Sequence, residues 1–153
     1  MEHKVRVLPA EELMQPLLQL LEETDAVPLL ISGNSMAPFL SHGRDTVYLS
    51  KVTEPLKRGD MILYRRDNGR YILHRIVKAE NGRYCLVGDA QTYLEPGIRP
   101  DQVLAKVSWI RRKGKIQKPG CFWWEFFEKV WIRLIPLRPM LVKGYMLLRG
   151  RKY

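Results

Sequence analysis

The sequence is poor in the residues that build metal centres and disulfide frameworks. It has two cysteines and three histidines among 153 residues. Cys85 and Cys121 lie far apart and belong to no spacing typical of metal ligands or redox pairs. They are expected to be either two reduced thiols or the two halves of one disulfide. No spacing in the chain implies a metal ion or an organic cofactor.

Long apolar runs are also absent from the sequence. A helix that crosses a bilayer needs about 20 apolar residues in a row, and no run approaching that length occurs. Residues 1–9 mix charged and short apolar side chains, and the apolar run 13–21 is interrupted by Gln15, Pro16 and Gln19. We therefore expect neither a signal peptide nor an N-terminal transmembrane anchor. A cytoplasmic or membrane-peripheral location follows as the expectation.

Acidic residues are scarce in the C-terminal part. Residues 111–153 contain 12 of the 26 lysines and arginines but two of the 16 acidic residues, so they hold the whole formal net charge of +10. Such a bias favours an acidic partner, either anionic lipid or nucleic acid. No recognisable nucleic-acid-reading motif accompanies the basic residues, so specific nucleic-acid binding is not expected.

Turn residues punctuate the middle of the chain. The leucine spacing in residues 10–24 predicts an amphipathic helix, and Pro28 marks a break after it. From there to about residue 110, tight turns recur with no helical pattern between them. The expected strands are 27–32, 46–49, 61–64, 70–77, 84–87 and 103–110. We therefore predict a mainly antiparallel β domain over residues 27–118, preceded by a helical segment over residues 1–26.

An aromatic and basic tail follows, over residues 119–153. Residues 121–135 have helical spacing with one polar stripe, and residues 140–148 predict a second short helix after two prolines. The aromatic residues are Trp123, Trp124, Phe126, Phe127 and Trp131. Two alternatives remain open for the tail. Either residues 121–149 make a peripheral contact with an anionic membrane, or the aromatic face packs on the β domain or on a second subunit. The oligomeric state is open.

A serine, a histidine and an aspartate form the candidate catalytic group. Ser35 stands on the turn that leaves an apolar strand. A serine hydroxyl needs a base to take its proton, and His74, within the strand 70–77, is the candidate base. Asp89 is the candidate to orient the imidazole, and Asp101 is a second candidate. The other histidines, His3 and His42, are expected to be solvated and uninvolved.

Four short motifs surround these residues in a fixed order. They are Gly33-x-Ser35-Met36-x-Pro38, Arg58-Gly59-Asp60-Met61-Ile62, His74-Arg75-Ile76-Val77 and Gly88-Asp89. Over about residues 30–108, this set resembles the ordered boxes of the signal peptidases. The commonest bacterial members carry lysine where this chain has His74. The chain is therefore similar to the Ser/His branch found in the endoplasmic reticulum, archaea and spore-forming bacteria.

The resemblance implies the β fold shared by signal peptidases and self-cleaving repressors, and a serine endopeptidase that cleaves signal or leader-like peptides or preproteins. In that mechanism Ser35 attacks the scissile carbonyl, His74 acts as general base and then as general acid, and Asp89 fixes the tautomer of His74. An imidazole with a pKa near neutral suits this work.

The remaining site residues lie close to the nucleophile. The backbone N–H of Ser35 is the natural oxyanion-hole donor, with Asn34 and Ser32 as further candidates. Met36 and Pro38 are candidates for substrate binding, with packing and turn roles as the competing interpretation.

Two other functions fit the same sequence. A protein of this fold without activity would be a membrane-associated binding module. A self-cleaving regulator would resemble the repressors of this fold, but those use a Ser/Lys pair and carry an N-terminal helix-turn-helix domain, for which residues 1–30 are too short. Signal peptidases usually have an N-terminal membrane anchor, and the apolar pattern of this sequence does not predict one.

Overall fold

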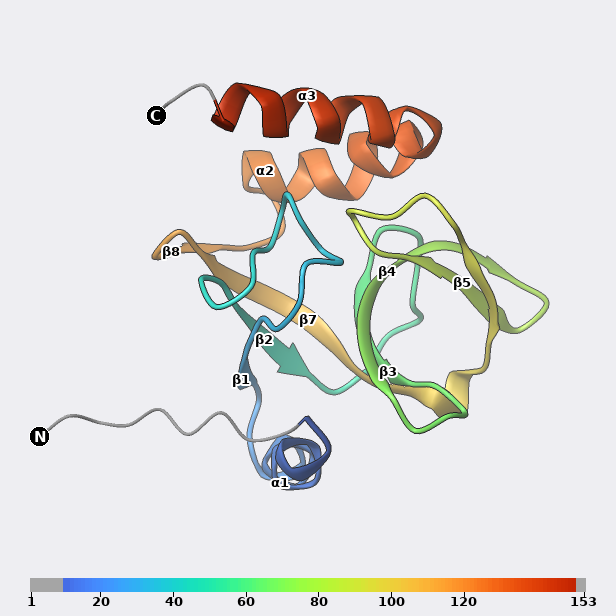
Figure 1. Ribbon diagram of the computed structural model, residues 1–153. Helices are drawn as coiled ribbons and strands as arrows, with labels where there is room; N and C mark the ends of the chain where they lie inside the picture. Colours follow the sequence, from blue (N-terminus) through green and yellow to red (C-terminus); the bar gives the residue numbers. More distant parts are fainter. Residues whose placement is uncertain (1–9, 151–153) are drawn as a thin grey trace, which may run out of the picture.

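The computed structural model describes residues 10–150 and contains one eight-stranded sheet in which every strand pairing is antiparallel (Figure 1). The strands are β1 (Val27–Leu30), β2 (Thr46–Ser50), β3 (Met61–Arg65), β4 (Tyr71–Glu80), β5 (Arg83–Val87), β6 (Glu95–Ile98), β7 (Val103–Arg112) and β8 (Lys115–Gln117). Their order is β1-β2-β7-β3-β4-β5-β6, with β8 paired to β7. The predicted mainly β fold with flanking helical segments is confirmed.

The sheet is strongly curved. In Figure 1, β3, β4 and β5 curl into a ring on one side, while β1, β2 and β8 lie on the other. The long strand β7 joins the two parts because it pairs with both β2 and β3. A short 3₁₀ turn, η1 (Pro100–Gln102), leads into β7.

Two of these strands were not predicted. We expected residues 95–97 to close a loop, and they begin β6; we placed residues 115–117 in a basic linker, and they form β8. Both are short edge segments that contain proline, glycine or charged residues, so they lack the apolar alternation by which strands are recognised.

The N-terminal helix α1 (Ala10–Glu23) matches the predicted helix within one residue. It buries one face, on which Met14, Leu17 and Leu21 recur at helical spacing, and these residues join the main hydrophobic core. The helix covers the end of the molecule opposite the C-terminal helices (Figure 1).

Alternating side chains divide the interior into two hydrophobic clusters. Met61 and Leu63 of β3 face the larger cluster, whereas Ile62 and Tyr64 of the same strand face the smaller one. Because successive residues of a strand point to opposite faces, β3 and its neighbour β4 form a wall between the two clusters. His74 lies directly opposite Ile62 and therefore on the side of the smaller cluster.

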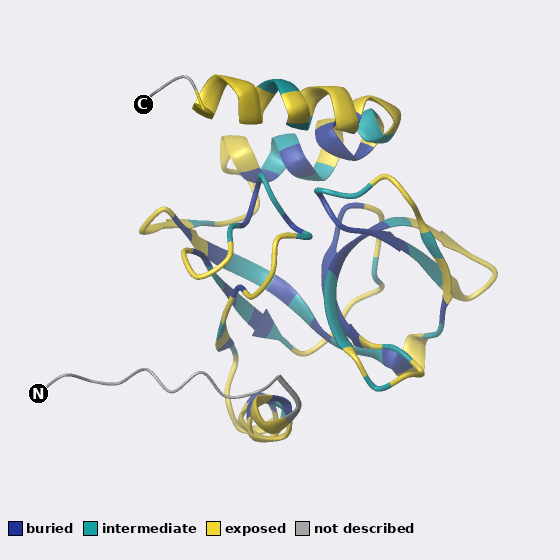
Figure 2. Ribbon diagram, viewed as in Figure 1, coloured by how far each residue is buried: buried dark blue, intermediate teal, exposed yellow. Residues whose placement is uncertain are grey.

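The tail packs on the β domain through its aromatic residues. It consists of α2 (Phe122–Glu125), a π-helical turn η2 (Phe126–Val130), a 3₁₀ segment η3 (Trp131–Leu137) and α3 (Arg138–Gly150). Trp124, Phe127 and Trp131 are buried in the larger cluster. In Figure 2 the tail segment that lies against the β domain accordingly shows dark blue bands. Phe127 stacks on the fully buried Phe39 with ring centroids 4.6 Å apart. Of the two alternatives for the aromatic face, packing on the β domain is the one observed for these three residues.

The helix α3 is longer than predicted. We expected a helix over residues 140–148, beginning after Pro139, but α3 begins at Arg138 and includes that proline. Proline is tolerated in the first turn of a helix because the N–H that it lacks has no intrahelical partner there.

The described part of the chain, residues 10–150, holds no helix long and apolar enough to cross a bilayer. Cys85 and Cys121 are both free thiols, which decides between the two alternatives for the cysteines.

Candidate functional site

Ser35 lies half-buried on the loop that follows β1, at one wall of a pocket of about 110 Å³. The loop turns at Gly33, whose φ of +85° lies in a region that other residues rarely adopt. The pocket is lined by Ile31, Ser32, Gly33, Ser35, Met36, Tyr71, Ile72 and Leu73. It therefore lies between the serine loop and the first half of β4.

A second loop holds Ser35 in place. The N–H of Ala90 donates to the carbonyl oxygen of Ser35 at 2.9 Å. A Cβ at Gly88 would lie 2.5 Å from that same oxygen, so only glycine allows the two loops to approach this closely. The Gly88-Asp89 motif is thus directly adjacent to the candidate nucleophile.

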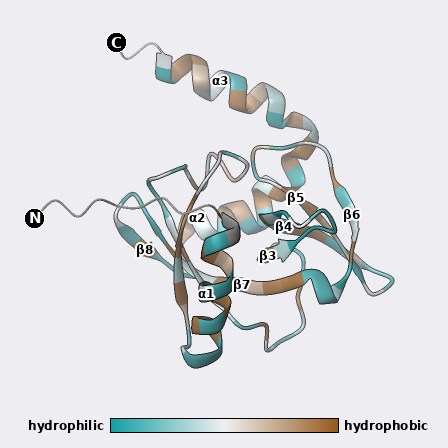
Figure 3. Ribbon diagram, turned by 60° about the horizontal axis from the view of Figure 1, so that its bottom comes forward, coloured by the Kyte–Doolittle hydropathy of each residue, from teal (hydrophilic) through white to brown (hydrophobic). Residues whose placement is uncertain are grey.

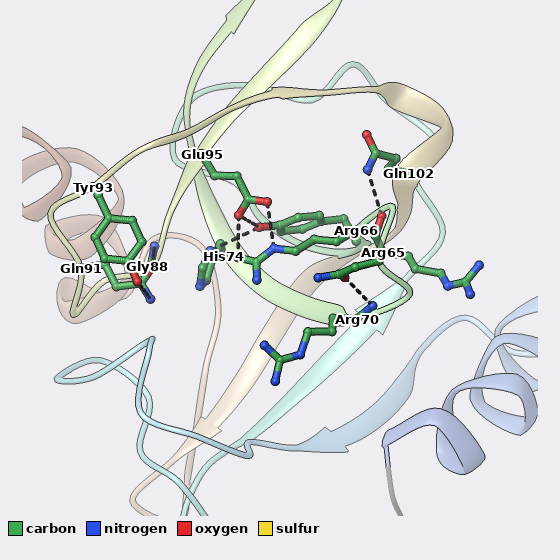
Figure 4. A network of polar contacts seen from close by, with 11 residues as sticks. Arg65, Arg66, Arg70, His74, Gly88, Gln91, Tyr93, Glu95 and Gln102 are labelled. Atoms are coloured by element: carbon green, nitrogen blue, oxygen red, sulfur yellow. Dashed lines mark hydrogen bonds and ion pairs between the residues drawn. The ribbon is translucent and has the colours of Figure 1, made fainter.

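His74 is buried, with 3% of its surface exposed. Its Nδ1 lies 3.4 Å from the hydroxyl oxygen of Tyr64, a neighbour on β3 (Figure 4). The hairpin register explains this contact: Tyr64 pairs with Ile72 and Ile62 pairs with His74, so Tyr64 and His74 are diagonal neighbours on one face.

Tyr64 connects His74 to a carboxylate. Its hydroxyl donates to Oε2 of Glu95 at 2.7 Å, and Glu95 also accepts hydrogen bonds from Nε and Nη2 of Arg66 at 2.9 and 2.7 Å (Figure 4). Because the single proton of the phenol goes to Glu95, only a protonated Nδ1 of His74 can donate to the Tyr64 oxygen. That tautomer leaves Nε2 with a free lone pair, as a general base requires.

The protonation states agree with this arrangement. Burial lowers the pKa of His74 from 6.5 to about 4, although the charges of Glu95 and Asp89 act in the opposite direction. Burial opposes ionisation of Glu95 as well, but the hydrogen bonds from Arg66 and Tyr64 outweigh it and lower the pKa of that carboxyl. Burial and the hydrogen bond to Glu95 raise the pKa of Tyr64, so its phenol keeps its proton. His74 is thus neutral at physiological pH, with a pKa well below the near-neutral value expected from sequence.

The depressed pKa of His74 makes stability depend on pH. Between pH 6.5 and pH 4 the unfolded chain binds a proton at residue 74 that the folded chain excludes, so stability decreases as pH falls through this window. We expect the free energy of unfolding to fall by about 2 kcal/mol between pH 6.5 and pH 5 because of this group. Urea denaturation at several pH values measures the slope. His74→Gln should reduce the slope, and an unchanged slope in that variant would contradict the assignment.

Asp89 has a different partner from the one expected. Both of its oxygens accept hydrogen bonds from Arg75, from Nε and Nη2 at 2.9 Å each, and both side chains are buried. Arg75 also donates to the carbonyl oxygen of Gly59, within the Arg58-Gly59-Asp60 motif. Asp89 therefore links two of the motifs through an ion pair, and its effect on His74 is through charge. The second candidate, Asp101, is exposed and pairs with Arg99.

Ser35 and His74 lie on adjoining segments of the chain but are not hydrogen-bonded. Leu73 lines the pocket beside Ser35, whereas the side chain of His74, the next residue of β4, points to the other face of the strand, toward the smaller cluster. The hydrogen bonds within residues 10–150 do not include one between the Ser35 hydroxyl and His74, and none involves the Ser35 backbone N–H. The hydroxyl and that N–H are thus both available to a bound group, as nucleophile and oxyanion donor require.

The other sequence candidates are placed as follows. Ser32 is exposed and lines the pocket, whereas Asn34 is exposed and does not line it. Met36 belongs to the larger cluster and also borders the pocket. Pro38 is absent from the pocket lining, and its carbonyl oxygen lies 3.5 Å from Nη2 of Arg112, so the structure gives it a turn role.

Sequence reasoning missed several residues of this site. His42 is exposed as expected, yet its Nδ1 accepts a hydrogen bond from the N–H of Gly33 at 2.8 Å and so helps to shape the serine loop. Tyr64 could have been found from the Asp67-Asn68-Gly69 turn, which sets the register that places it beside His74. No sequence pattern indicated that Glu95 and Arg66 belong to the site. Glu95 lies in a segment whose composition is typical of a turn.

The described residues 10–150 contain no group of three or more His, Cys, Asp or Glu side chains arranged to hold a metal ion. In comparisons with known proteins, no family model matches the chain, and no curated protein is significantly similar to it. The likeness to signal peptidases therefore depends on the four short motifs.

Proposed function

We propose that the protein is a serine endopeptidase of the signal-peptidase type, and that it cleaves leader or signal-like peptides with Ser35 as nucleophile and His74 as base. The observation that carries this proposal is an unengaged serine hydroxyl at the wall of a pocket whose other wall is the strand that holds a buried, neutral His74. Comparable contacts in free enzymes are often long and tighten only when substrate binds.

The proposed reaction follows from these positions. Oγ of Ser35 attacks the scissile carbonyl carbon while Nε2 of His74 takes the hydroxyl proton. The developing oxyanion accepts a hydrogen bond from the N–H of Ser35. His74 then gives the proton to the leaving amine, and water hydrolyses the acyl-enzyme by the same route. An extended peptide would lie in the pocket between residues 31–36 and residues 71–73, which suits small side chains because the pocket is small.

Tyr64 and Glu95 take the place that the sequence analysis gave to Asp89. Their hydrogen bonds hold His74 in the required tautomer, and the negative charge of Glu95 favours the imidazolium that forms during the reaction. Because burial lowers the pKa of His74 to about 4, the rate should stay flat between about pH 5 and pH 8 and fall only near pH 4.

Tyr64→Phe tests this positioning role. The variant keeps the ring in the smaller cluster but removes the hydroxyl between His74 and Glu95. We expect kcat to fall by about 10- to 100-fold, less than the roughly 10⁴-fold loss seen when a triad imidazole is held in the wrong tautomer, with little change in KM. Tyr48→Phe, which alters a tyrosine that stacks on Trp109 and does not line the pocket, is the matched control. Equal activity of the two variants would contradict the role of Tyr64.

A covalent probe tests the proposal as a whole. The purified protein is treated with a serine-directed phosphonate, and the modified peptide is located by mass spectrometry in the wild type, Ser35→Ala and His74→Ala. We expect labelling at Ser35 in the wild type alone. Since signal peptidases resist many serine reagents, cleavage of a leader-like peptide is measured in parallel. Absence of both labelling and cleavage would contradict the proposal.

A second candidate function is a binding module that holds a peptide in the same pocket without cleaving it. The missing hydrogen bond between Ser35 and His74 and the strongly depressed pKa of His74 favour this candidate, because a weakly basic imidazole is a less effective base. It predicts peptide binding that Ser35→Ala leaves unchanged and no turnover by the wild type.

A further inference from the structure

The helix α3 carries an exposed apolar surface. Its members are spaced i, i+3, i+4, i+8 and i+11, so that they form a single stripe along the helix, which we call the α3 stripe. The α3 stripe consists of Leu137, Met140, Leu141, Tyr145 and Leu148. All five are exposed, from 41% at Leu141 to 68% at Leu148. Leu147, at its border, is 64% exposed.

Residues in the first turns of α3 fix the helix to the body of the protein. Arg138 is fully buried and donates from Nη1 to the carbonyl oxygens of Gly88 and Gln91, and from Nη2 to that of Trp131. One turn later, Val142 packs against the larger cluster. The α3 stripe is exposed beside this anchored part, with Tyr145 at its edge near Arg44 and Arg112 of the β domain, and Figures 1 and 3 show α3 as an outer element with apolar segments along it.

Basic residues border the stripe. Lys143 and Arg149 are exposed on its two flanks, and Lys129 and Arg133 are exposed on the preceding segment. Residues 129–153 contain seven lysines and arginines and no aspartate or glutamate. An apolar stripe with basic flanks is the pattern of helices that lie in the plane of a membrane interface.

We propose that α3 docks in the interface of an anionic lipid surface, with the α3 stripe among the acyl chains and Lys143 and Arg149 at the headgroups. The helix has 13 residues and spans about 20 Å, short of the roughly 30 Å of a bilayer core, so it lies along the surface. This proposal does not rest on the proposed peptidase function.

Charge favours lipid over a second copy of the chain as the occupant. If two stripes packed together, Lys143 and Arg149 of each copy would approach those of the other, with no acidic side chain on α3 to pair with them. Anionic headgroups supply the opposite charge, and each basic residue near such a surface strengthens binding by about fivefold.

Co-sedimentation of the full chain with vesicles tests the proposal. Vesicles of equimolar phosphatidylcholine and phosphatidylglycerol are compared with vesicles of phosphatidylcholine alone. We expect the wild type to bind the anionic vesicles and to bind the neutral ones at least tenfold more weakly. Leu141→Glu/Leu148→Glu should weaken binding to anionic vesicles at least tenfold, and Lys143→Gln/Arg149→Gln should weaken it by about 25-fold.

Matched variants distinguish the contribution of the α3 stripe to membrane binding from the contribution of the protein's overall positive charge. Leu13→Glu/Leu20→Glu introduces the same two charges at exposed positions of α1, at the opposite end of the molecule, and should bind nearly as the wild type does. Ser35→Ala should also bind normally, so failure of membrane binding and failure of the peptidase proposal are distinguishable. Circular dichroism checks that each variant is folded.

Three results, two in vesicle binding and one in oligomeric state, would overturn the proposal. The first is equal binding of anionic vesicles by the stripe variant and the α1 control, and the second is no binding by the wild type. The third is a wild-type dimer in light scattering that becomes monomeric in Leu141→Glu/Leu148→Glu, which would assign the stripe to a second copy.

Discussion

Replacing Ser35 by alanine should lower kcat/KM for a leader-like peptide by at least about a thousandfold, because the variant has no nucleophile at the pocket wall. The substitution should leave the fold intact. The Ser35 hydroxyl makes no hydrogen bond within residues 10–150, and the loop is held by its backbone, through the carbonyl of Ser35 and the N–H of Ala90. Ser35→Ala should therefore lose activity while its thermal stability stays close to that of the wild type.

The measurement is peptide hydrolysis followed by mass spectrometry, together with thermal unfolding. Ser41→Ala is the matched control, since Ser41 lies on the same loop outside the pocket and should retain full activity. If Ser35→Ala and the wild type cleaved at the same rate, residue 35 would not be the nucleophile.

Asp89→Ala should lower the free energy of unfolding by about 3–5 kcal/mol. The reason is that Arg75, with 1% of its side chain exposed, would keep its charge in the interior without the carboxylate that now binds it. Removing one member of a buried ion pair is more damaging than removing both. Arg75→Met/Asp89→Leu should therefore recover part of the lost stability.

Urea denaturation measures these changes. Glu80→Ala, which breaks an exposed pair with Lys78, is the control and should change stability by less than about 1 kcal/mol. A stable Asp89→Ala variant without activity would contradict the structural role and would return Asp89 to the orienting role expected from sequence.

Local sequence patterns predicted the elements that have strong periodicity or strong turns. The leucines of α1 and the apolar strands between glycine-containing turns belong to this group. The partners of polar side chains were harder to predict, because they depend on register and on contacts between distant segments. Asp89 illustrates the difficulty. The motifs suggested that Asp89 contacts His74, but its partner is the next residue, Arg75. Successive strand residues point to opposite faces, so Arg75 and His74 lie on different sides of β4.

The tail shows a similar limit. Its composition indicated an aromatic surface but could not specify what covers it. That depended on Phe39, a residue more than 80 positions away in sequence, against which Trp124 and Phe127 pack. The apolar residues Met140, Leu141 and Leu148 of α3 are exposed, and a partner for them stays a prediction.

The hydrogen bonds between the tail and the loop 88–91 have a consequence for folding during synthesis. Trp131 donates from its indole nitrogen to the carbonyl oxygen of Asp89, and Arg138 donates to those of Gly88 and Gln91. A nascent chain that has emerged from the ribosome only as far as β8 lacks all of these donors. The contacts that cover the loop beside Ser35 can then form only after residue 138 has been synthesised, so the surroundings of the candidate nucleophile depend on a segment about 100 residues further along the chain.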